Sequence, residues 1–198
     1  MGAWGAQSML TPSASSWKHH TFPGKQATRF THGTYAGRSG MYAQADASAS
    51  MVRKFVRQEP ADLGNMKFSW LVPELIDGAD LTVRERGDSP VRVVLAFEGD
   101  RTRFSAKNAN LSELARMLTG EEMPYATLMY VWSNQHAPGS VIINPRTDRV
   151  RKLVVESGPD KLGRWLDYER NIRADYEKTF GEAPGALLAV GLMTDADN

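Results

Sequence analysis

The chain contains no cysteine in its 198 residues. Disulfide frameworks, thiol catalysis and zinc–thiolate sites are therefore excluded. The longest nearly apolar run, Gly185–Met193, falls far short of the roughly 20 residues that a membrane-spanning helix needs. Met1–Leu10 lacks the basic start and the apolar centre of a secretory signal, so we expect no such signal in this sequence.

Neither sign of charge is in excess. Lys and Arg number 24 and Asp and Glu number 23, which gives a formal net charge of +1. Nucleic-acid-binding proteins typically carry a clear excess of basic residues, so we expect no nucleic-acid partner. The length suits one domain. We expect a flexible leader at the Gly/Ala/Ser-rich residues 1–16 and a single domain at residues 17–198.

Several well-known catalytic motifs are also missing. The sequence has no G-x-S-x-G, P-loop, G-x-G-x-x-G or H-E-x-x-H pattern. These patterns place nucleophiles, phosphate-binding amides and zinc ligands in common enzyme classes. Their absence argues against the common hydrolases, nucleotide-binding enzymes and zinc proteases.

Short strand patterns dominate the sequence. Met66–Val72 and Val91–Glu98 alternate apolar and polar side chains, and Tyr125–Trp132 is rich in β-branched and aromatic residues. Further strands are expected at Thr28–Tyr35, Met41–Asp46, Met51–Val56, Val141–Ile143, Val150–Glu156 and Ala186–Thr194. Many short strands separated by turn residues predict a mainly β protein, an antiparallel β-sandwich or jelly roll.

Two α-helices are expected between these strands. The first has Asn110 as N-cap, leucines at helical spacing after it, and Gly120 as its stop. The second is expected at about Asp160–Phe180, with Gly181 as its C-terminal stop.

Glu169 falls in the middle of the apolar stripe of the second expected helix. Desolvation there would raise the pKa of its carboxyl and would suit a general acid. The alternative is an ion pair with Arg173 at i,i+4 that shields the edge of the stripe.

Arg92 interrupts an otherwise apolar strand, on the face opposite Val91, Val93 and Leu95. One interpretation is a solvated side chain on an outer face. The other is a groove in which Arg92 forks onto a carboxylate or onto sugar hydroxyls, with Asp88 orienting it.

Aromatic side chains give another candidate surface. Tyr130 and Trp132 share one face of their strand, and Asn134 follows. Aromatic rings and amides bind sugars by stacking and by hydrogen bonds. The alternative is that Trp132 belongs to the core.

The C-terminal residues include hard oxygen ligands. Asp195 and Asp197 point to the same side if the last strand continues through them, and Asn198 follows. Carboxylates and an amide oxygen suit Ca²⁺, although the spacing is not that of an EF-hand. A solvated strand end is the alternative.

An ordered series of motifs runs from Trp17 to Asn198. It includes Phe68-Ser69-Trp70, Asp88-Ser89-Pro90-Val91-Arg92-Val93, Leu118–Leu128, Tyr130-Val131-Trp132, Glu156-Ser157-Gly158, Phe180-Gly181-Glu182 and Met193–Asn198. In these motifs the chain resembles the bacterial domain-of-unknown-function family 3047. The resemblance implies a jelly-roll sandwich like those of carbohydrate modules, and a periplasmic or secreted protein.

The resemblance also marks polar positions of the family pattern, among them Asp88, Arg92, Glu169, Arg170, Asp195, Asp197 and Asn198. Ser69 departs from that pattern, in which a basic residue is usual. The pattern also continues past Asn198 into a further strand, so the resemblance implies that the domain extends beyond this chain.

Three functions are compatible with these observations. The first is a carbohydrate-binding module that uses Arg92, Asp88, Tyr130, Trp132, Asn134 and Arg170, with Ca²⁺ held by Asp195, Asp197 and Asn198. The second is a glycan-active hydrolase or lyase with Glu169 and Asp195 as its carboxylate pair. The third is a non-catalytic envelope protein that presents an apolar surface patch to a partner.

Overall fold

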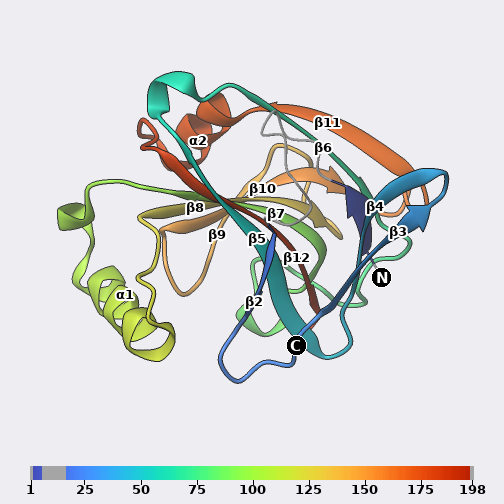
Figure 1. The fold of residues 1–198 in the computed structure, drawn as a ribbon, viewed down its shortest axis with the longest axis horizontal. Helices are drawn as coiled ribbons and strands as arrows, with labels where there is room; N and C mark the ends of the chain where they lie inside the picture. Colours follow the sequence, from blue (N-terminus) through green and yellow to red (C-terminus); the bar gives the residue numbers. More distant parts are fainter. Residues whose placement is uncertain (1, 6–16, 197–198) are drawn as a thin grey trace.

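The computed structural model describes residues 2–5 and 17–196 (Figure 1). Two β-sheets pack face to face, and their facing side chains form the main core. The expectation of a mainly β, sandwich-like fold with two helices is confirmed. No helix in the described part of the chain is long and apolar enough to cross a membrane.

The smaller sheet has five strands in the order β11-β6-β1-β4-β3. Their bounds are β1 Gly2–Gly5, β3 Arg29–Tyr35, β4 Arg38–Gln44, β6 Asn65–Leu71 and β11 Trp165–Asn171. Strands β3 and β4 pair as a hairpin. Its turn is tight, because Ala36 and Gly37 both adopt positive φ angles, of 46° and 78°. Two such residues close a hairpin whose twist matches that of the strands.

The larger sheet has seven strands in the order β2-β5-β12-β7-β8-β10-β9. Their bounds are β2 Lys18–Thr21, β5 Ser48–Gln58, β7 Ser89–Phe97, β8 Ala126–Ser133, β9 Val141–Ile143, β10 Val150–Ser157 and β12 Leu187–Ala196. This sheet is mixed, because β10 runs parallel to β8. The expectation of a purely antiparallel sandwich is wrong at this pair.

The expected leader contains a strand. Gly2–Gly5 forms β1, which pairs with β4 on one side and with β6 on the other. A flexible leader throughout residues 1–16 is therefore contradicted at these four positions. Backbone pairing to two partners supplies the order here, and local sequence composition carries no signal of it. Residues 6–16 lie outside the described part.

Only the second half of the second expected helix is helical, because a strand precedes it. Residues Trp165–Asn171 form β11, and only Ile172–Phe180 form the helix α2. Leu166 and Tyr168 pack against the core at period-2 spacing, which competes with the helical period in the same residues. Asn171 caps α2 through its side chain, which accepts from the amide of Ala174 at 2.9 Å.

The first helix, α1, spans Ala106–Thr119 and begins before the expected cap. Ser105 is the N-cap, and its hydroxyl accepts from the amide of Asn108 at 3.2 Å. The expected stop is confirmed, since Gly120 adopts the left-handed conformation with φ 78°. Figure 1 shows α1 standing out from the sheets on one side, while α2 lies beside β11 at another end of the molecule.

Candidate functional site

A groove of about 520 Å³ lies on the outer face of the larger sheet, away from the core. We call it the outer groove. Its floor includes Arg92, Lys152, Met193 and Asp195. Its walls come from α1 and from residues 72–88, the loop that joins β6 to β7.

The floor contains a buried ion pair between neighbouring central strands. Arg92 Nη2 on β7 donates to Asp195 Oδ2 on β12 at 2.7 Å, and it donates to the carbonyl of Gly87 at 2.6 Å. The two side chains are only 6% and 12% exposed. A guanidinium has five N–H donors, and Arg92 Nε is buried without a hydrogen-bond partner among the described residues.

A β-bulge places this pair. Arg92 lies opposite Met193, whereas Ser89 lies opposite Asp195, so β7 has one more residue than β12 over this stretch. Pro90 lies within the bulge, the position at which a central strand tolerates proline. The bulge changes the direction of β7 beside the groove, which brings Arg92 and Asp195 together.

Lys152 is the second buried cation of the floor. Lys152 is 3% exposed, and its Nζ donates to the carbonyl of Leu81 at 3.3 Å. Burial, together with the nearby positive charge of Arg92, lowers the pKa of Lys152 to about 8. An ammonium group has three donors, so this contact with Leu81 leaves donor capacity at the floor.

The loop of residues 72–88 is held in place by Asp80. Its carboxylate accepts from the hydroxyl of Thr82 at 2.6 Å and from Nε2 of Gln135 at 2.9 Å. His136 Nε2 lies 3.2 Å from the same carboxylate. The hydrogen bonds from Thr82, followed by the one from His136, hold the pKa of Asp80 well below its usual range. These contacts of Asp80 therefore fix the loop segment that carries Leu81 in the wall of the groove.

The charge of the outer groove is positive. Five cationic side chains line it against one carboxylate, namely Lys25, Arg84, Arg92, Arg146 and Lys152 against Asp195. A cleft lined by one sign of charge attracts ligands of the other sign. The rest of the lining is largely aliphatic, so this groove favours an anion that also has an apolar part.

The structure does not leave the expected aromatic face open to solvent. Tyr130 is 0% and Trp132 is 1% exposed, and both belong to the core. Their strand β8 lies between β7 and β10, and its alternation aims these rings at the smaller sheet. Asn134 is engaged too, since its Nδ2 donates to the carbonyl of Ile76 at 2.7 Å. A stacking platform at Tyr130 and Trp132 is therefore wrong.

The structure also separates the expected carboxylate pair. Glu169 is exposed and lies in register with Lys67 on β6, on the outer face of the smaller sheet. It accepts from Asn65 Nδ2 at 3.0 Å and does not form the expected pair with Arg173, which contacts Glu177. Asp195 lies on the outer face of the other sheet. Because packed sheets are about 10 Å apart, these carboxyls cannot flank one bond.

Arg170 lies away from the outer groove. It holds the buried carboxylate of Asp175 with two hydrogen bonds, of 2.8 and 2.7 Å. Tyr130 donates its hydroxyl to the same carboxylate at 2.8 Å. Burial, reinforced by that carboxylate, raises the pKa of Tyr130 above its usual range. This network joins β11, α2 and β8, so Arg170 stabilises the sandwich.

The expected calcium ligands are only partly described. Asp195 is paired with Arg92, so a cation there would compete with a guanidinium for the same carboxylate. Asp197 and Asn198 lie outside the described residues, and a calcium site at the three positions stays a prediction. Asp88 is buried next to the groove, one residue after Gly87. Within residues 2–5 and 17–196, no cluster of three or more metal-binding side chains occurs.

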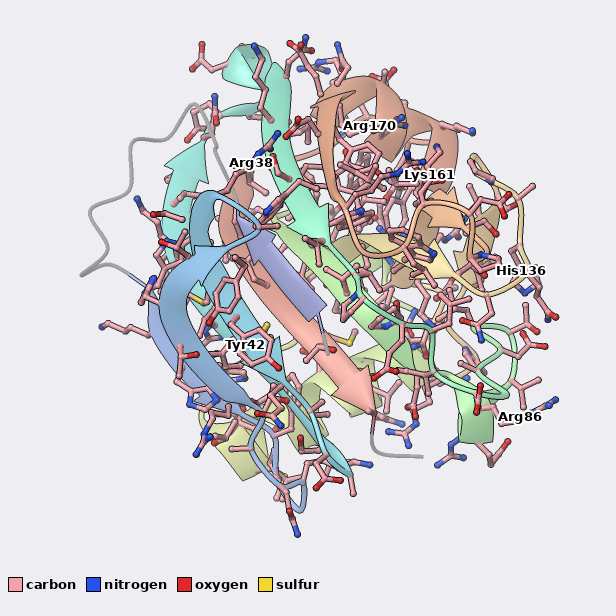
Figure 2. All side chains as sticks on the ribbon, turned by 90° about the vertical axis from the view of Figure 1, so that its right-hand side faces the viewer. Arg38, Tyr42, Arg86, His136, Lys161 and Arg170 are labelled. Carbon is pink, nitrogen blue, oxygen red and sulfur yellow. The ribbon has the colours of Figure 1, made fainter. Side chains whose placement is uncertain are left out.

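A second cavity, of about 580 Å³, lies on the smaller sheet beside Arg38 and Trp165. Arg38 pairs with Asp167 at 2.5 and 3.0 Å and covers the ring of Trp165. Figure 2 shows Arg38 and Tyr42 on this sheet, apart from Arg86 and His136.

Four cationic contributors to the outer groove, Lys25, Arg84, Arg146 and Lys152, were not predicted from the sequence. Lys152 interrupts an apolar strand as Arg92 does, and that shared pattern could have identified it. Arg84 and Arg146 come from loops, for which no periodicity applies. Pairing between strands far apart in the sequence brings these side chains to one face.

The comparisons with known proteins agree with the motif pattern. No curated protein matches the chain significantly. The model of the family described as "Protein of unknown function (DUF3047)" matches residues 15–198, nearly the whole chain. The chain therefore belongs to the DUF3047 family.

Proposed function

We propose that this protein is a non-catalytic carbohydrate-binding module, and that it binds an acidic saccharide in the outer groove. The observation that carries the proposal is the buried pair of cations, Arg92 and Lys152, on the floor of an open groove. Buried lysine ammonium groups are costly unless they serve a partner. A carboxylate of the saccharide would use the donors that Lys152 has left, next to the positive charge of Arg92.

Further polar groups in the lining fit saccharide hydroxyls. Thr119 and Asn144 line the groove together with the exposed Arg84 and Arg146. Hydroxyl, amide and guanidinium groups are the donors and acceptors that orient sugars. The DUF3047 resemblance implies a periplasmic or secreted protein, and such a location would expose the groove to polysaccharides of the envelope or the surroundings.

Affinity electrophoresis tests the proposal. The protein runs through gels that contain polygalacturonate, alginate, neutral dextran or dextran sulfate. We expect polygalacturonate or alginate to retard it and dextran to leave it unaffected. Lys152→Met should remove the retardation, whereas the matched variant Lys67→Met, on the outer face of the other sheet, should keep it.

Two results would overturn this function. One is the absence of retardation by both uronate polymers when circular dichroism shows folded protein. The other is retardation by the uronate polymers that Lys152→Met and Lys67→Met preserve equally. Such retardation, like retardation by dextran sulfate alone, indicates nonspecific attraction of a polyanion and no groove-specific binding.

A further inference from the structure

Helix α1 buries polar side chains and exposes apolar ones, the reverse of an ordinary amphipathic helix. Its buried residues are Asn108 and Ser112, which are polar. Leu114 is 51%, Met117 is 75% and Leu118 is 64% exposed. Surface helices normally bury their leucines and expose their polar face. The leucines of α1 are therefore not accounted for by packing within the described fold.

Polar contacts, rather than apolar packing, hold α1 in place. Asn108 Nδ2 donates to Asp148 at 2.7 Å, and Asn108 Oδ1 accepts from the hydroxyl of Thr147 at 2.7 Å. The guanidinium of Arg101 donates to Ser112 in the middle of the helix. These contacts fix the helix on its polar side and leave its apolar side open.

The apolar side of α1 faces the outer groove. Leu111, Leu114, Ala115 and Leu118 all line it, and they lie on one stripe of the helix at i, i+3, i+4 and i+7. Met117 does not line it. We call the four lining residues the α1 stripe. Met193 and Leu81 add apolar surface from the sheet and from the loop.

We infer that the acidic saccharide of the outer groove carries an aliphatic chain, which packs against the α1 stripe. This inference rests on the proposed function and adds the class of the ligand, an anionic glycolipid-like saccharide. Charge complementarity places the acid at Lys152 and Arg92, and the apolar wall takes the chain. Burying a chain on exposed leucines releases water from both surfaces, which favours binding.

The length of the stripe sets the size of the chain. Leu111 and Leu118 are seven residues apart, and seven residues of α-helix rise about 10 Å. An extended chain of about eight carbons covers this length. Octyl glucuronide, which joins one uronic acid to an octyl chain, is therefore the probe of choice.

Isothermal titration calorimetry with four probes tests the inference. The probes are octyl glucuronide, glucuronate, octyl glucoside and octanoate, and the three that carry an alkyl chain are used below their micelle concentrations. We expect octyl glucuronide to bind at least about tenfold more tightly than glucuronate and than either octyl glucoside or octanoate. The double variant Leu114→Gln/Leu118→Gln should remove the gain over glucuronate. Met117→Gln is the matched control on the same helix, and it should leave the gain intact.

Each other outcome identifies what fails. Equal affinity for octyl glucuronide and glucuronate, or a gain that Leu114→Gln/Leu118→Gln leaves unchanged, overturns the inference and leaves the proposed function standing. Octanoate binding as tightly as octyl glucuronide overturns both, because no sugar is then recognised. Absence of binding by all four probes and by the uronate polymers overturns the proposed function and the inference with it.

Discussion

Arg92 and Asp195, 103 residues apart in the sequence, meet with Nη2 2.7 Å from Oδ2 on the floor of the outer groove. Both side chains are nearly removed from water. Attraction within such a pair offsets the cost of burying each charge, and loss of one partner leaves the other uncompensated. The pair thus fixes the relation of β7 to β12 at the point where the bulge bends the sheet.

Asp195→Asn should lower the free energy of unfolding by about 3 kcal/mol, because it leaves the guanidinium of Arg92 buried without its counter-ion. Urea denaturation at pH 7 measures the change. Glu169→Gln is the control, since the Glu169 side chain is 51% exposed and contacts Lys67 only at 3.8 Å. We expect that control to remain within about 0.5 kcal/mol of the unchanged protein. A loss below about 1 kcal/mol in Asp195→Asn would contradict the role given to the pair.

Lys152→Met should stabilise the protein at pH 7 while removing binding in the outer groove. Methionine retains much of the aliphatic stem and removes an ammonium that burial penalises. The pKa of about 8, against a usual 10.5, corresponds to a penalty of up to about 3 kcal/mol. We expect a gain of about 1–3 kcal/mol by urea denaturation. A loss of stability would show that the contact with Leu81 outweighs the cost of burial.

The same pKa predicts how stability varies with pH. Between about pH 8 and pH 10.5 the folded chain has lost the proton of Lys152 while the unfolded chain still holds it. The free energy of unfolding should therefore rise with pH in this window. Lys152→Met should lack this contribution, so its advantage over the unchanged protein should shrink from pH 7.5 to pH 10. A constant advantage would mean that Lys152 does not titrate in this window.

Local patterns predicted those parts of the fold that local physics decides. The alternation of Val91, Val93 and Leu95 identified a strand with one face in the core. Gly120 and Gly181 marked the helix ends, because the left-handed conformation there is most favourable for glycine. Each of these features depends on a few neighbouring residues, which the sequence displays directly.

Features that depend on distant pairing were not predictable in this way. The stretch around Glu169 satisfies a helical and a strand period at once, and pairing with β6 selects the strand. Tyr130 and Trp132 were assigned to the right strand, but only the position of β8 within its sheet decides that their face is buried. Arg92 was identified as unusual, whereas its partner Asp195 became evident only from the neighbouring strand.

Tyr130→Phe should destabilise the protein without affecting the outer groove. The change removes a hydroxyl that donates to Asp175 at 2.8 Å inside the core. Loss of a buried hydrogen bond to a charged group costs about 1.5–3 kcal/mol, which thermal or urea denaturation detects. Retardation by polygalacturonate should stay as in the unchanged protein. If Tyr130→Phe instead weakened retardation while remaining folded, the ring would have to contribute to binding despite its burial.

Binding of a uronate in the outer groove should take up a proton near pH 8.5. The carboxylate favours the charged form of Lys152, so binding raises the pKa of the ammonium above about 8. At pH 8.5 part of the free protein is deprotonated at Lys152 and gains a proton on binding, whereas at pH 6 it is already protonated. Calorimetry with octyl glucuronide in buffers of different ionisation enthalpy measures this uptake. We expect an uptake that is clear at pH 8.5 and close to zero at pH 6, with affinity falling as the pH rises further.

Lys67→Met should behave in the same way, because Lys67 lies on the opposite sheet. Equal uptake at both pH values would show that the ligand does not lie against Lys152.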